Sequence, residues 1–216
     1  IGIHQISEIF GQPGVHLVGP LPAPIQNYTT YVAGVSTAAR DPEIAKAFCE
    51  RNRGWRYLRT KQGSGAKSYN FGLQHTTARF IARVDADNWL SPRFVELLMP
   101  AFRDHAVGIS YPRMCLVDER GGPNGNQSAA RHYDYDTLRR ENYVDTCCIA
   151  RRQCFEDVGG IYPFPYLDDW IFNLDVTRAG WAMHYTDEDL VYYRQHGGQC
   201  TREHDYIRSR ANVAKW

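Results

Sequence analysis

The run from Arg79 to Pro92 constrains the fold more than any other part of the chain. It reads R-F-I-A-R-V-D-A-D-N-W-L-S-P. Its first half has the β-branched and aromatic bias of a buried strand, and Ser91-Pro92 is a typical helix N-cap followed by an N1 proline. Asp85 and Asp87 therefore come at the carboxyl end of a strand and before a helix, where open α/β sheets bind ligands.

The two aspartates of this D-x-D run can hold a divalent cation. Side chains two residues apart at the tip of a strand over Phe80–Val84 point the same way, so Asp85 and Asp87 face one crevice. Carboxylates are hard oxygen ligands that leave the other coordination positions to water and phosphate oxygens. The alternative is a loop with two solvated aspartates, which a bare D-x-D does not exclude.

Strand-like runs and capped helices alternate from Tyr28 to Phe102. The expected elements are a strand over Tyr28–Val35, a helix from Asp41-Pro42 to about Glu50, a short strand from Trp55, and a helix from the glycine-rich turn at 63–65 to about Thr77. Such alternation predicts an α/β fold, Rossmann-like, with a mixed and mostly parallel sheet and helices on both faces.

Four further segments accompany the D-x-D run. They are W-R-Y-L-R-T-K-Q-G-S-G-A-K-S-Y-N-F-G-L (Trp55–Leu73), Y-V-D-T-C-C-I-A-R-R-Q-C-F-E-D-V-G-G-I-Y (Tyr143–Tyr162), Y-L-D-D-W-I-F-N-L-D-V-T-R-A-G-W (Tyr166–Trp181) and Y-Y-R-Q-H-G-G (Tyr192–Gly198). In order and spacing the five resemble the inverting, family-two glycosyltransferases, which have the GT-A nucleotide-sugar fold. The resemblance covers about residues 50–200, and no single motif in it is specific.

The resemblance implies a nucleoside-diphosphate sugar as donor, a carbohydrate or other hydroxyl compound as acceptor, and a divalent cation, Mn²⁺ or Mg²⁺. Asp87 is the expected first metal ligand. Asp85 is expected to contact the ribose, or the cation through water. His196, in the segment that resembles the family's "Y-R-x-H", is a further candidate for the metal shell.

The same resemblance implies the catalytic base. Asp169 matches the second acid of the family's "E-D" motif, and Asp168 is the alternative base or a group that holds the acceptor hydroxyl. We expect a helix over Trp170–Ala179, whose dipole would lower the pKa of these carboxyls. Adjacent aspartates at a helix start are also ordinary N-caps, and this structural interpretation stays open.

Other roles are implied for the donor and acceptor. Lys67 and Asn70 lie on the helix after the glycine-rich turn, where family members approach the nucleotide, and glycines at a helix N-terminus suit phosphate. Arg194 could reach the diphosphate. The region Asp118–Asp134, which is rich in glycine and asparagine, is expected to be a long flexible loop that orders over a donor or acceptor.

The first 48 residues point elsewhere. The stretch Gly14–Phe48 resembles the C-terminal part of a molybdate-type periplasmic solute-binding protein. We therefore expect an N-terminal segment over residues 1–48, either a fusion or an atypical start of the domain, and a GT-A-like domain over residues 49–216. Where family-two enzymes carry "D-D-G-S", this chain has Val35–Ala39 without a carboxylate, so the usual nucleotide motif is not visible.

Composition limits the partners. The 216 residues carry 25 basic and 24 acidic side chains, a net charge of +1, which does not indicate a nucleic-acid-binding surface. No apolar run reaches the roughly 18 residues of a membrane span, so no transmembrane segment is expected and peripheral membrane association stays open. The six cysteines form no C-x-x-C pair, which favours reduced thiols and a cytoplasmic enzyme.

Three classes of function follow. The first is a metal-dependent inverting glycosyltransferase. The second is a catalytically inactive GT-A-like binding module, which the absent nucleotide motif favours. The third is a solute-binding protein fragment, which only the first 48 residues suggest.

Overall fold

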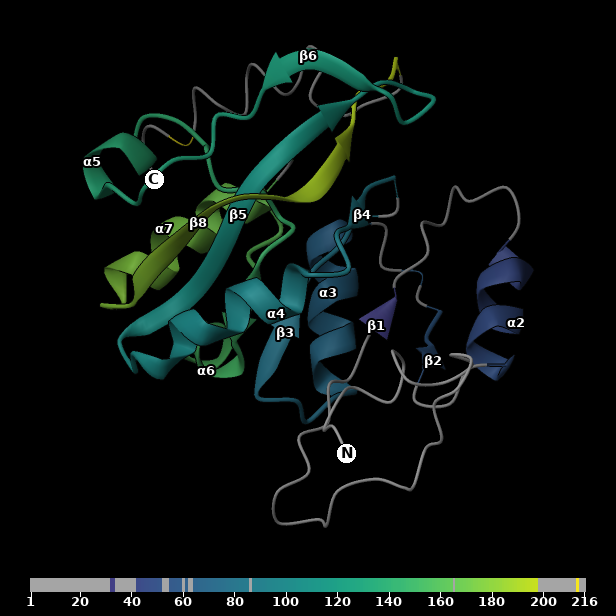
Figure 1. The fold of residues 1–216 in the computed structure, drawn as a ribbon. Helices are drawn as coiled ribbons and strands as arrows, with labels where there is room; N and C mark the ends of the chain where they lie inside the picture. Colours follow the sequence, from purple (N-terminus) through teal and green to yellow (C-terminus); the bar gives the residue numbers. More distant parts are fainter. Residues whose placement is uncertain are drawn as a thin grey trace, which may run out of the picture.

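The structure is a computed structural model that describes residues 32–33, 42–51, 55–59, 61, 64–85, 87–164, 166–197 and 213. The chain order of its elements is visible in Figure 1. They are β1 (Val32–Ala33), α2 (Pro42–Arg51), β2 (Arg56–Tyr57), α3 (Gly65–Gln74), β3 (Phe80–Ala82), β4 (Trp89–Leu90), α4 (Phe94–Leu98), η2 (Met99–Arg103), β5 (Val107–Val117), β6 (Pro123–Gln127), α5 (Tyr135–Leu138), β7 (Ile149–Arg151), α6 (Arg152–Asp157), α7 (Asp168–Arg178) and β8 (Ala182–Arg194).

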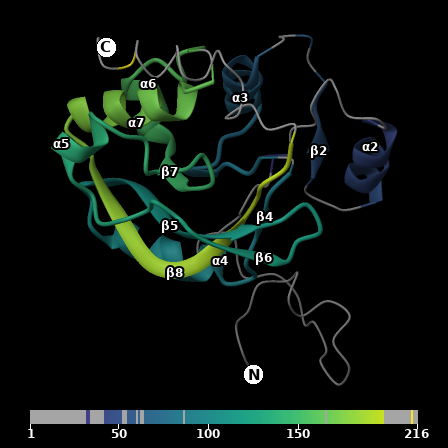
Figure 2. The ribbon, with the colours of Figure 1, turned by 90° about the horizontal axis from the view of Figure 1, so that it is seen from above.

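A six-stranded sheet forms the centre of the molecule. Its order is β3-β7-β5-β8-β4, with β6 paired to β5, and a separate parallel pair joins β1 to β2. Within the large sheet β5 and β8 pair in parallel and the other pairs are antiparallel. Figure 2 shows β5 and β8 curling around the side that carries α3, α6 and α7.

The α/β class and the mixed sheet are confirmed, but the expected predominance of parallel pairs needs correction. The strands β3, β5 and β8 do share one direction. However, β7 enters from later in the chain and separates β3 from β5, and β6 returns directly after β5 as a hairpin. A tight hairpin makes β6 antiparallel to β5, and β7, which follows after residues 128–148, runs antiparallel to both of its neighbours.

Helices cover both faces of the sheet, as expected, and the alternation of side chains along β7 shows how. Ala150 packs into a core with residues of α3, α6 and α7. Its neighbour Ile149 packs into a second core with Phe94 and Leu98 of α4. Successive strand residues point to opposite faces. The strand β7, although only three residues long, therefore packs against the helices on both faces of the sheet.

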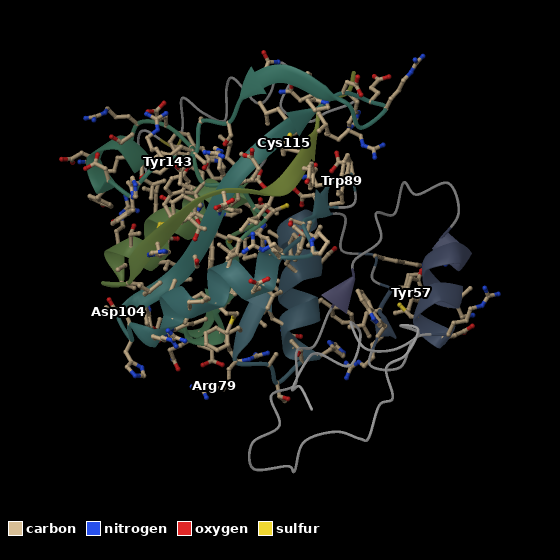
Figure 3. All side chains as sticks on the ribbon, viewed as in Figure 1. Tyr57, Arg79, Trp89, Asp104, Cys115 and Tyr143 are labelled. Atoms are coloured by element: carbon tan, nitrogen blue, oxygen red, sulfur yellow. The ribbon has the colours of Figure 1, made fainter. Side chains whose placement is uncertain are left out.

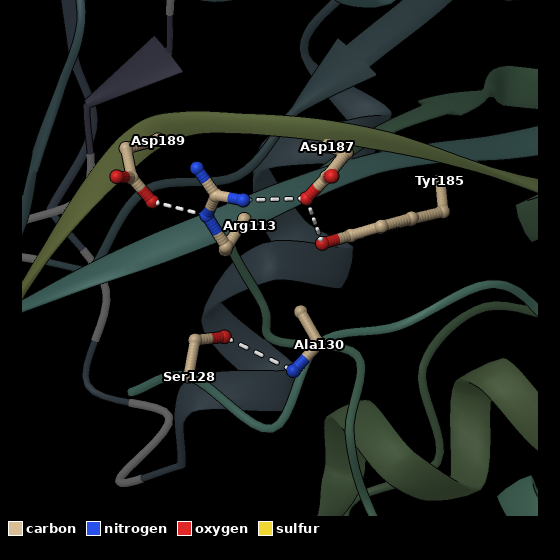
Figure 4. A network of polar contacts seen from close by, with 6 residues as sticks. All are labelled: Arg113, Ser128, Ala130, Tyr185, Asp187 and Asp189. Atoms are coloured by element: carbon tan, nitrogen blue, oxygen red, sulfur yellow. Dashed lines mark hydrogen bonds and ion pairs between the residues drawn. The ribbon is translucent and has the colours of Figure 1, made fainter. Parts of the chain in front are cut away.

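The sheet bends at Arg113 of β5. The register between β5 and β8 shifts on both sides of this residue, as at a β-bulge, which increases local curvature. The Arg113 guanidinium contacts Asp187 and Asp189 of β8, and the Tyr185 hydroxyl donates to Asp187 (Figure 4). These ion pairs are exposed, so they contribute to the geometry of the bend more than to stability.

Several expected boundaries move by two or three residues. The strand expected over Phe80–Val84 ends at Ala82. Ser91 does not cap a helix directly; its carbonyl oxygen accepts from the Phe94 amide in a turn, and α4 begins at Phe94. The helix α7 begins at Asp168, two residues before the expected Trp170.

The region Asp118–Asp134 is not the expected long flexible loop. It contains β6, which pairs with β5. The turn of this hairpin is held by Asp118, whose Oδ1 accepts from the amides of Arg120 and Gly122 at 2.8 and 2.9 Å. The aspartate side chain thus replaces backbone hydrogen bonds, which stabilises a turn that the glycine-rich sequence alone made look unstructured.

The N-terminal segment and the expected absence of a transmembrane segment can be compared with the structure only in part. Of the N-terminal segment, residues 1–31 lie outside the described residues, as does Val35–Ala39. The described helices include none that is long and apolar enough to cross a bilayer.

Candidate active site

Asp85 lies just beyond the carboxyl end of β3, as expected. The hydroxyl of Tyr69, on α3, donates to Asp85 Oδ1 at 3.1 Å. The pKa of the Asp85 carboxyl is raised to about 6, because burial and the nearby Asp145 raise it by more than Arg83 lowers it. Asp85 is therefore a half-buried acid at the end of a strand, held in place by an aromatic side chain of the neighbouring helix.

Two partners of Asp85 come from the segment before β7. Ligand atoms of Asp85, Asp145 and Cys147 all lie within 4.8 Å of one another. Burial raises the pKa of the Asp145 carboxyl and raises that of the Cys147 thiol well above its ordinary value. The thiol is therefore a poor ligand until a cation displaces its proton, whereas the two carboxylates offer the hard oxygens that Mg²⁺ and Mn²⁺ take.

Asp87 is brought to His196, although 109 residues separate them in the chain. The His196 Nε2 lies 3.1 Å from Asp87 Oδ2. The same end of β8 is fixed by Asn88, whose Oδ1 accepts from the Arg194 amide at 3.0 Å. Two of the three expected metal residues are thus in contact.

Arg194, at the end of β8, packs its side chain against an aromatic pair. Its guanidinium lies 5.3 Å from the ring centroid of Trp89, which is labelled in Figure 3 and in turn stacks on Tyr192. Its Nη1 donates to the Glu119 carbonyl oxygen at 3.5 Å. Arg194 is therefore close to the Asp87–His196 pair, where a diphosphate contact was expected, and the contact itself stays a prediction.

The other two acids begin α7. The Asn142 amide donates to Asp169 Oδ2 at 3.0 Å, and Asp169 Oδ1 accepts from the Trp170 amide at 2.7 Å. The helix is anchored below them because the buried Trp170 indole donates to the Leu138 carbonyl oxygen and the Asn173 amide donates to that of Val144. A buried aromatic and a buried amide thus fix where the helix presents its first turn.

The expected lowering of the Asp169 pKa is wrong. The pKa of the Asp169 carboxyl is raised to about 7, because burial and then the adjacent Asp168 raise it by more than the hydrogen bond from Asn142 and the charge of Arg83 lower it. Loss of hydration therefore outweighs the helix dipole at this position. A carboxyl that ionises near neutral pH is well suited to accept a proton.

One buried cation faces these acids. Arg83 is 4% exposed, its Nη2 donates to the Thr146 hydroxyl at 2.9 Å, and its guanidinium lies 4.4 Å from the Tyr69 ring centroid. Its charge acts on four carboxyls, which we call the acidic cluster: Asp85, Asp145, Asp168 and Asp169. One positive charge among four acids leaves an excess of negative charge that a divalent cation would offset.

Lys67 and Asn70, the two residues of α3 that were expected near the nucleotide, differ in their surroundings. Lys67 is exposed on the first turn of α3, open to a ligand. Asn70 has both polar atoms engaged with Ile161, since its Nδ2 donates to the Ile161 carbonyl oxygen and its Oδ1 accepts from the Ile161 amide, each at 2.8 Å. That pairing favours a structural role for Asn70 over the expected nucleotide contact.

Sequence reasoning missed Arg83, Asp145 and Cys147. A signal existed for two of them. Arg83 is a charged residue inside an otherwise apolar run, and Asp145 stands alone in Y-V-D-T-C-C, so each needs a partner if it is buried. Cys147 had no such signal, because a cysteine at the start of an apolar run is ordinary core.

The chain belongs to glycosyl transferase family 2, whose model matches residues 36–159, more than half of the 216 residues. The matched region contains Asp85, Asp87 and Asp145. It also reaches into the segment 1–48, for which the resemblance to a solute-binding protein is not shown. The domain boundary expected at residue 48 stays a prediction.

Individual relatives agree with the family. The chain is 24% identical to an uncharacterised glycosyltransferase of Haemophilus influenzae over an alignment of 153 residues, with coverage of 64% of this chain and 47% of that protein. Among solved structures it is similar to residues 1–349 of S. aureus TarS in complex with UDP-GlcNAc, with a TM-score of 0.61, 16% identity, and coverage of 82% of this chain and 54% of that one. The complex of the same protein with UDP gives a TM-score of 0.57 at 16% identity, with coverage of 82% and 53%. The chain thus spans about half the length of these relatives, and the structural likeness establishes the GT-A fold.

Proposed function

We propose that this chain is the donor-binding and catalytic part of a metal-dependent, inverting glycosyltransferase. It would transfer a sugar from a nucleoside-diphosphate sugar to a hydroxyl group of an acceptor. The observation that supports this best is the acidic cluster, because it joins acids from the end of β3 to acids at the start of α7 around one buried guanidinium. Family membership supplies the class of reaction.

The residues fit a divalent cation. Asp85 and Asp145 supply carboxylate oxygens within 4.8 Å of each other, and Asp87 with His196 supplies a further oxygen and an imidazole nitrogen. Oxygen ligands with one imidazole suit Mn²⁺ as well as Mg²⁺. We propose that Asp87, Asp85 and His196 hold the cation, with Asp145 in support.

Asp169 is proposed as the base. As the acceptor oxygen forms its bond to the anomeric carbon, the Asp169 carboxylate takes the hydroxyl proton, and the bond from that carbon to the nucleoside diphosphate breaks on the opposite face. Asn142 holds one carboxylate oxygen, and Asp168 is next to it. A bound cation would offset the negative charge that develops on the departing phosphate.

The donor is proposed to be a UDP-sugar. The support is that the structurally similar TarS was solved with UDP-GlcNAc and with UDP. Arg194 and Lys67 are the side chains we propose to meet the phosphates. We further propose a cytoplasmic location, which suits the free thiols of Cys49, Cys115, Cys147, Cys148 and Cys154.

The test combines binding and turnover. Isothermal titration of UDP-GlcNAc and other nucleotide sugars, with and without Mn²⁺, should give binding that strengthens with the cation. Asp87→Ala should remove the effect of Mn²⁺ while leaving the fold intact. Glu96→Ala removes one carboxylate from an exposed pair with Arg93 and serves as the matched control, which should bind like the parent.

The outcomes separate the alternatives. Metal-dependent binding with release of UDP in the presence of an acceptor supports the proposal. Donor binding without any transfer or hydrolysis would indicate a catalytically inactive GT-A-like module. Donor binding by Asp87→Ala that responds to Mn²⁺ as the parent does would remove Asp87 from the metal site.

A further inference from the structure

Burial of the charged Arg83 guanidinium costs free energy unless other groups compensate its charge. The guanidinium is always charged, and charged groups are buried only when paired. Within the described residues its Nε has no hydrogen-bond partner, and its Nη2 donates to a neutral hydroxyl, that of Thr146. The charge of Arg83 is therefore balanced by the acidic cluster as a whole and not by one ion-pair partner.

The geometry ties Arg83 to both halves of the acidic cluster. On one side, its Nη2 bonds Thr146, the neighbour of Asp145, and its face lies over Tyr69, whose hydroxyl bonds Asp85. On the other side, Tyr69 belongs to α3, and the first turn of that helix packs against Asp168, because a Cβ added at Gly65 would lie 3.8 Å from Asp168 Oδ2. The guanidinium thus lies beside the metal-side acids, and the helix whose Tyr69 ring it covers also reaches the base-side acids through its first turn.

We infer that Arg83 is a positioning residue: a built-in counter-cation shared by the two halves of the acidic cluster, which keeps Asp169 charged for its role as base and partly offsets the charge at the cation site. This inference rests on the proposed function and deepens it. Asp169 is faced by Asp168 on its own helix, by Asp145 from the segment before β7, and by Arg83 from the end of β3. Among these three charged groups, only Arg83 is positive.

The electrostatic pattern agrees with this placement. Burial raises the pKa of Asp168 and of Asp169, and Arg83 acts against the shift in both. For Arg83 itself burial acts to lower the pKa, yet neighbouring groups raise it overall, Tyr69 most of all and then Asp168, Cys148 and Asp169. The two effects are reciprocal, as they must be for interacting charges.

The test uses three substitutions on the full chain. Arg83→Met removes the charge and keeps an apolar stem of similar length. Arg83→Lys keeps the charge and loses the planar fork and much of the packing on Tyr69. Thr146→Val removes the hydroxyl that holds the guanidinium while preserving side-chain volume, and it provides a variant that should fold if Arg83→Met does not.

Arg152→Met is the matched control. It also removes a guanidinium held by protein atoms, but that group bonds the carbonyl oxygens of Leu73, Thr76 and Ala78 at the other end of α3. It should lower stability and leave the pH dependence of turnover unchanged.

The first measurement is kcat against pH with UDP-GlcNAc. For Arg83→Met we expect the acidic limb of the profile to move to higher pH by about one unit, because a carboxylate that loses an opposite charge is harder to ionise. Arg83→Lys should keep the parent's limb even where it loses stability, and Thr146→Val should shift in the same direction by less. A general loss of packing would lower stability in both Arg83 variants and would not separate methionine from lysine.

The second measurement needs no turnover. Mn²⁺ affinity without nucleotide, measured by titration calorimetry at about pH 8 so that the Asp85 carboxyl is ionised in both proteins, should rise by roughly tenfold in Arg83→Met, because a positive charge near the cation site is gone. The inference is overturned if Arg83→Met keeps the parent's pH profile, or if its Mn²⁺ affinity does not rise. A parent that binds donor but never turns it over defeats the proposed function and, with it, the role of Arg83 toward the base; an active parent with unshifted variants defeats the Arg83 inference alone.

Discussion

At the scale of single residues, Asp169 shows how burial and helix position compete. The carboxyl begins α7, where the dipole favours a negative charge, yet burial raises its pKa to about 7 and the adjacent Asp168 adds to the shift. The dipole effect is worth roughly 0.3–1 kcal/mol at exposed sites, whereas burial can move a carboxyl by several pKa units. Burial therefore wins, and it produces a carboxyl that ionises near neutral pH.

We expect Asp169→Asn to lower turnover by roughly 10²–10⁴-fold, because the amide keeps the shape and cannot accept the proton. Donor affinity should barely change. The measurement is single-turnover transfer with a UDP-sugar, beside titration of the donor. Asp175→Asn, which changes an acid paired with Arg178 on the same helix, is the control and should transfer at the parent rate; if Asp168→Asn alone is inactive, the base is Asp168.

The same substitution should stabilise the protein at high pH. The folded pKa of Asp169, about 7, lies above its ordinary value of 3.8, so its contribution is present below the ordinary value and is lost as pH rises through 7. Asparagine carries no such penalty. The Tm of Asp169→Asn should therefore exceed the Tm of the parent by on the order of 2–4 °C at pH 8. The two Tm values should converge near pH 4. A parent whose Tm rises from pH 5 to pH 8 relative to the variant would contradict the raised pKa.

At the scale of elements, α3 links the two halves of the site. Its first turn packs near Asp168, its middle supplies Tyr69 to Asp85, and Asn70 bonds the backbone of Ile161. The contact with that backbone is close enough to require glycine at position 160, where φ is +92° and a Cβ would lie 2.9 Å from Asn70 Oδ1. One helix thus fixes the distance between the end of β3 and the segment that leads into α7.

This arrangement predicts different outcomes for two residues of α3. Asn70→Ala should lower the free energy of unfolding by about 1–3 kcal/mol, because it leaves partly buried backbone groups of Ile161 unpaired, and the folded variant should bind donor normally. Lys67→Ala should leave stability within about 0.5 kcal/mol of the parent and weaken donor binding. Chemical denaturation and donor titration on both variants decide the point, and weakened donor binding in a fully stable Asn70→Ala would restore its expected nucleotide role.

At the scale of the whole molecule, the site closes only where the end of β8 meets the tip of β3. Asp87 and His196 are in contact across 109 residues of chain, and the Arg194 amide bonds Asn88 beside them. A ligand of this site binds the folded state and not the unfolded state, and such binding stabilises the fold by mass action. The site and the closure of the large sheet are therefore thermodynamically coupled.

Consequently, Mn²⁺ and UDP together should raise Tm by more than the sum of their separate effects, because each completes the binding site of the other. A ligand at about 100 times its Kd contributes about 2.7 kcal/mol. Removal of the metal with a chelator should return Tm to the UDP-only value. Differential scanning fluorimetry measures this directly; additive shifts would mean that metal and nucleotide bind apart.

Much of this organisation could be predicted from the sequence, and the reason is locality. The strand before Asp85, the helix after the glycine-rich turn and the helix at Asp168-Asp169 depend on side chains within a few residues, through periodicity, capping and turn chemistry. Those elements and the α/β class are present as expected, with ends displaced by two or three residues. The order of the motifs further predicted the family.

Only the tertiary structure decided what these residues do to one another. The direction of the Asp169 pKa shift, the insertion of β7 between β3 and β5, and the meeting of Arg83 with acids from three separate segments all depend on contacts between separate segments of the chain. Burial and electrostatic coupling are properties of such contacts, and a pattern read along the chain does not contain them. The sequence determined which acids reach the end of a strand or helix, and the fold determined their charge.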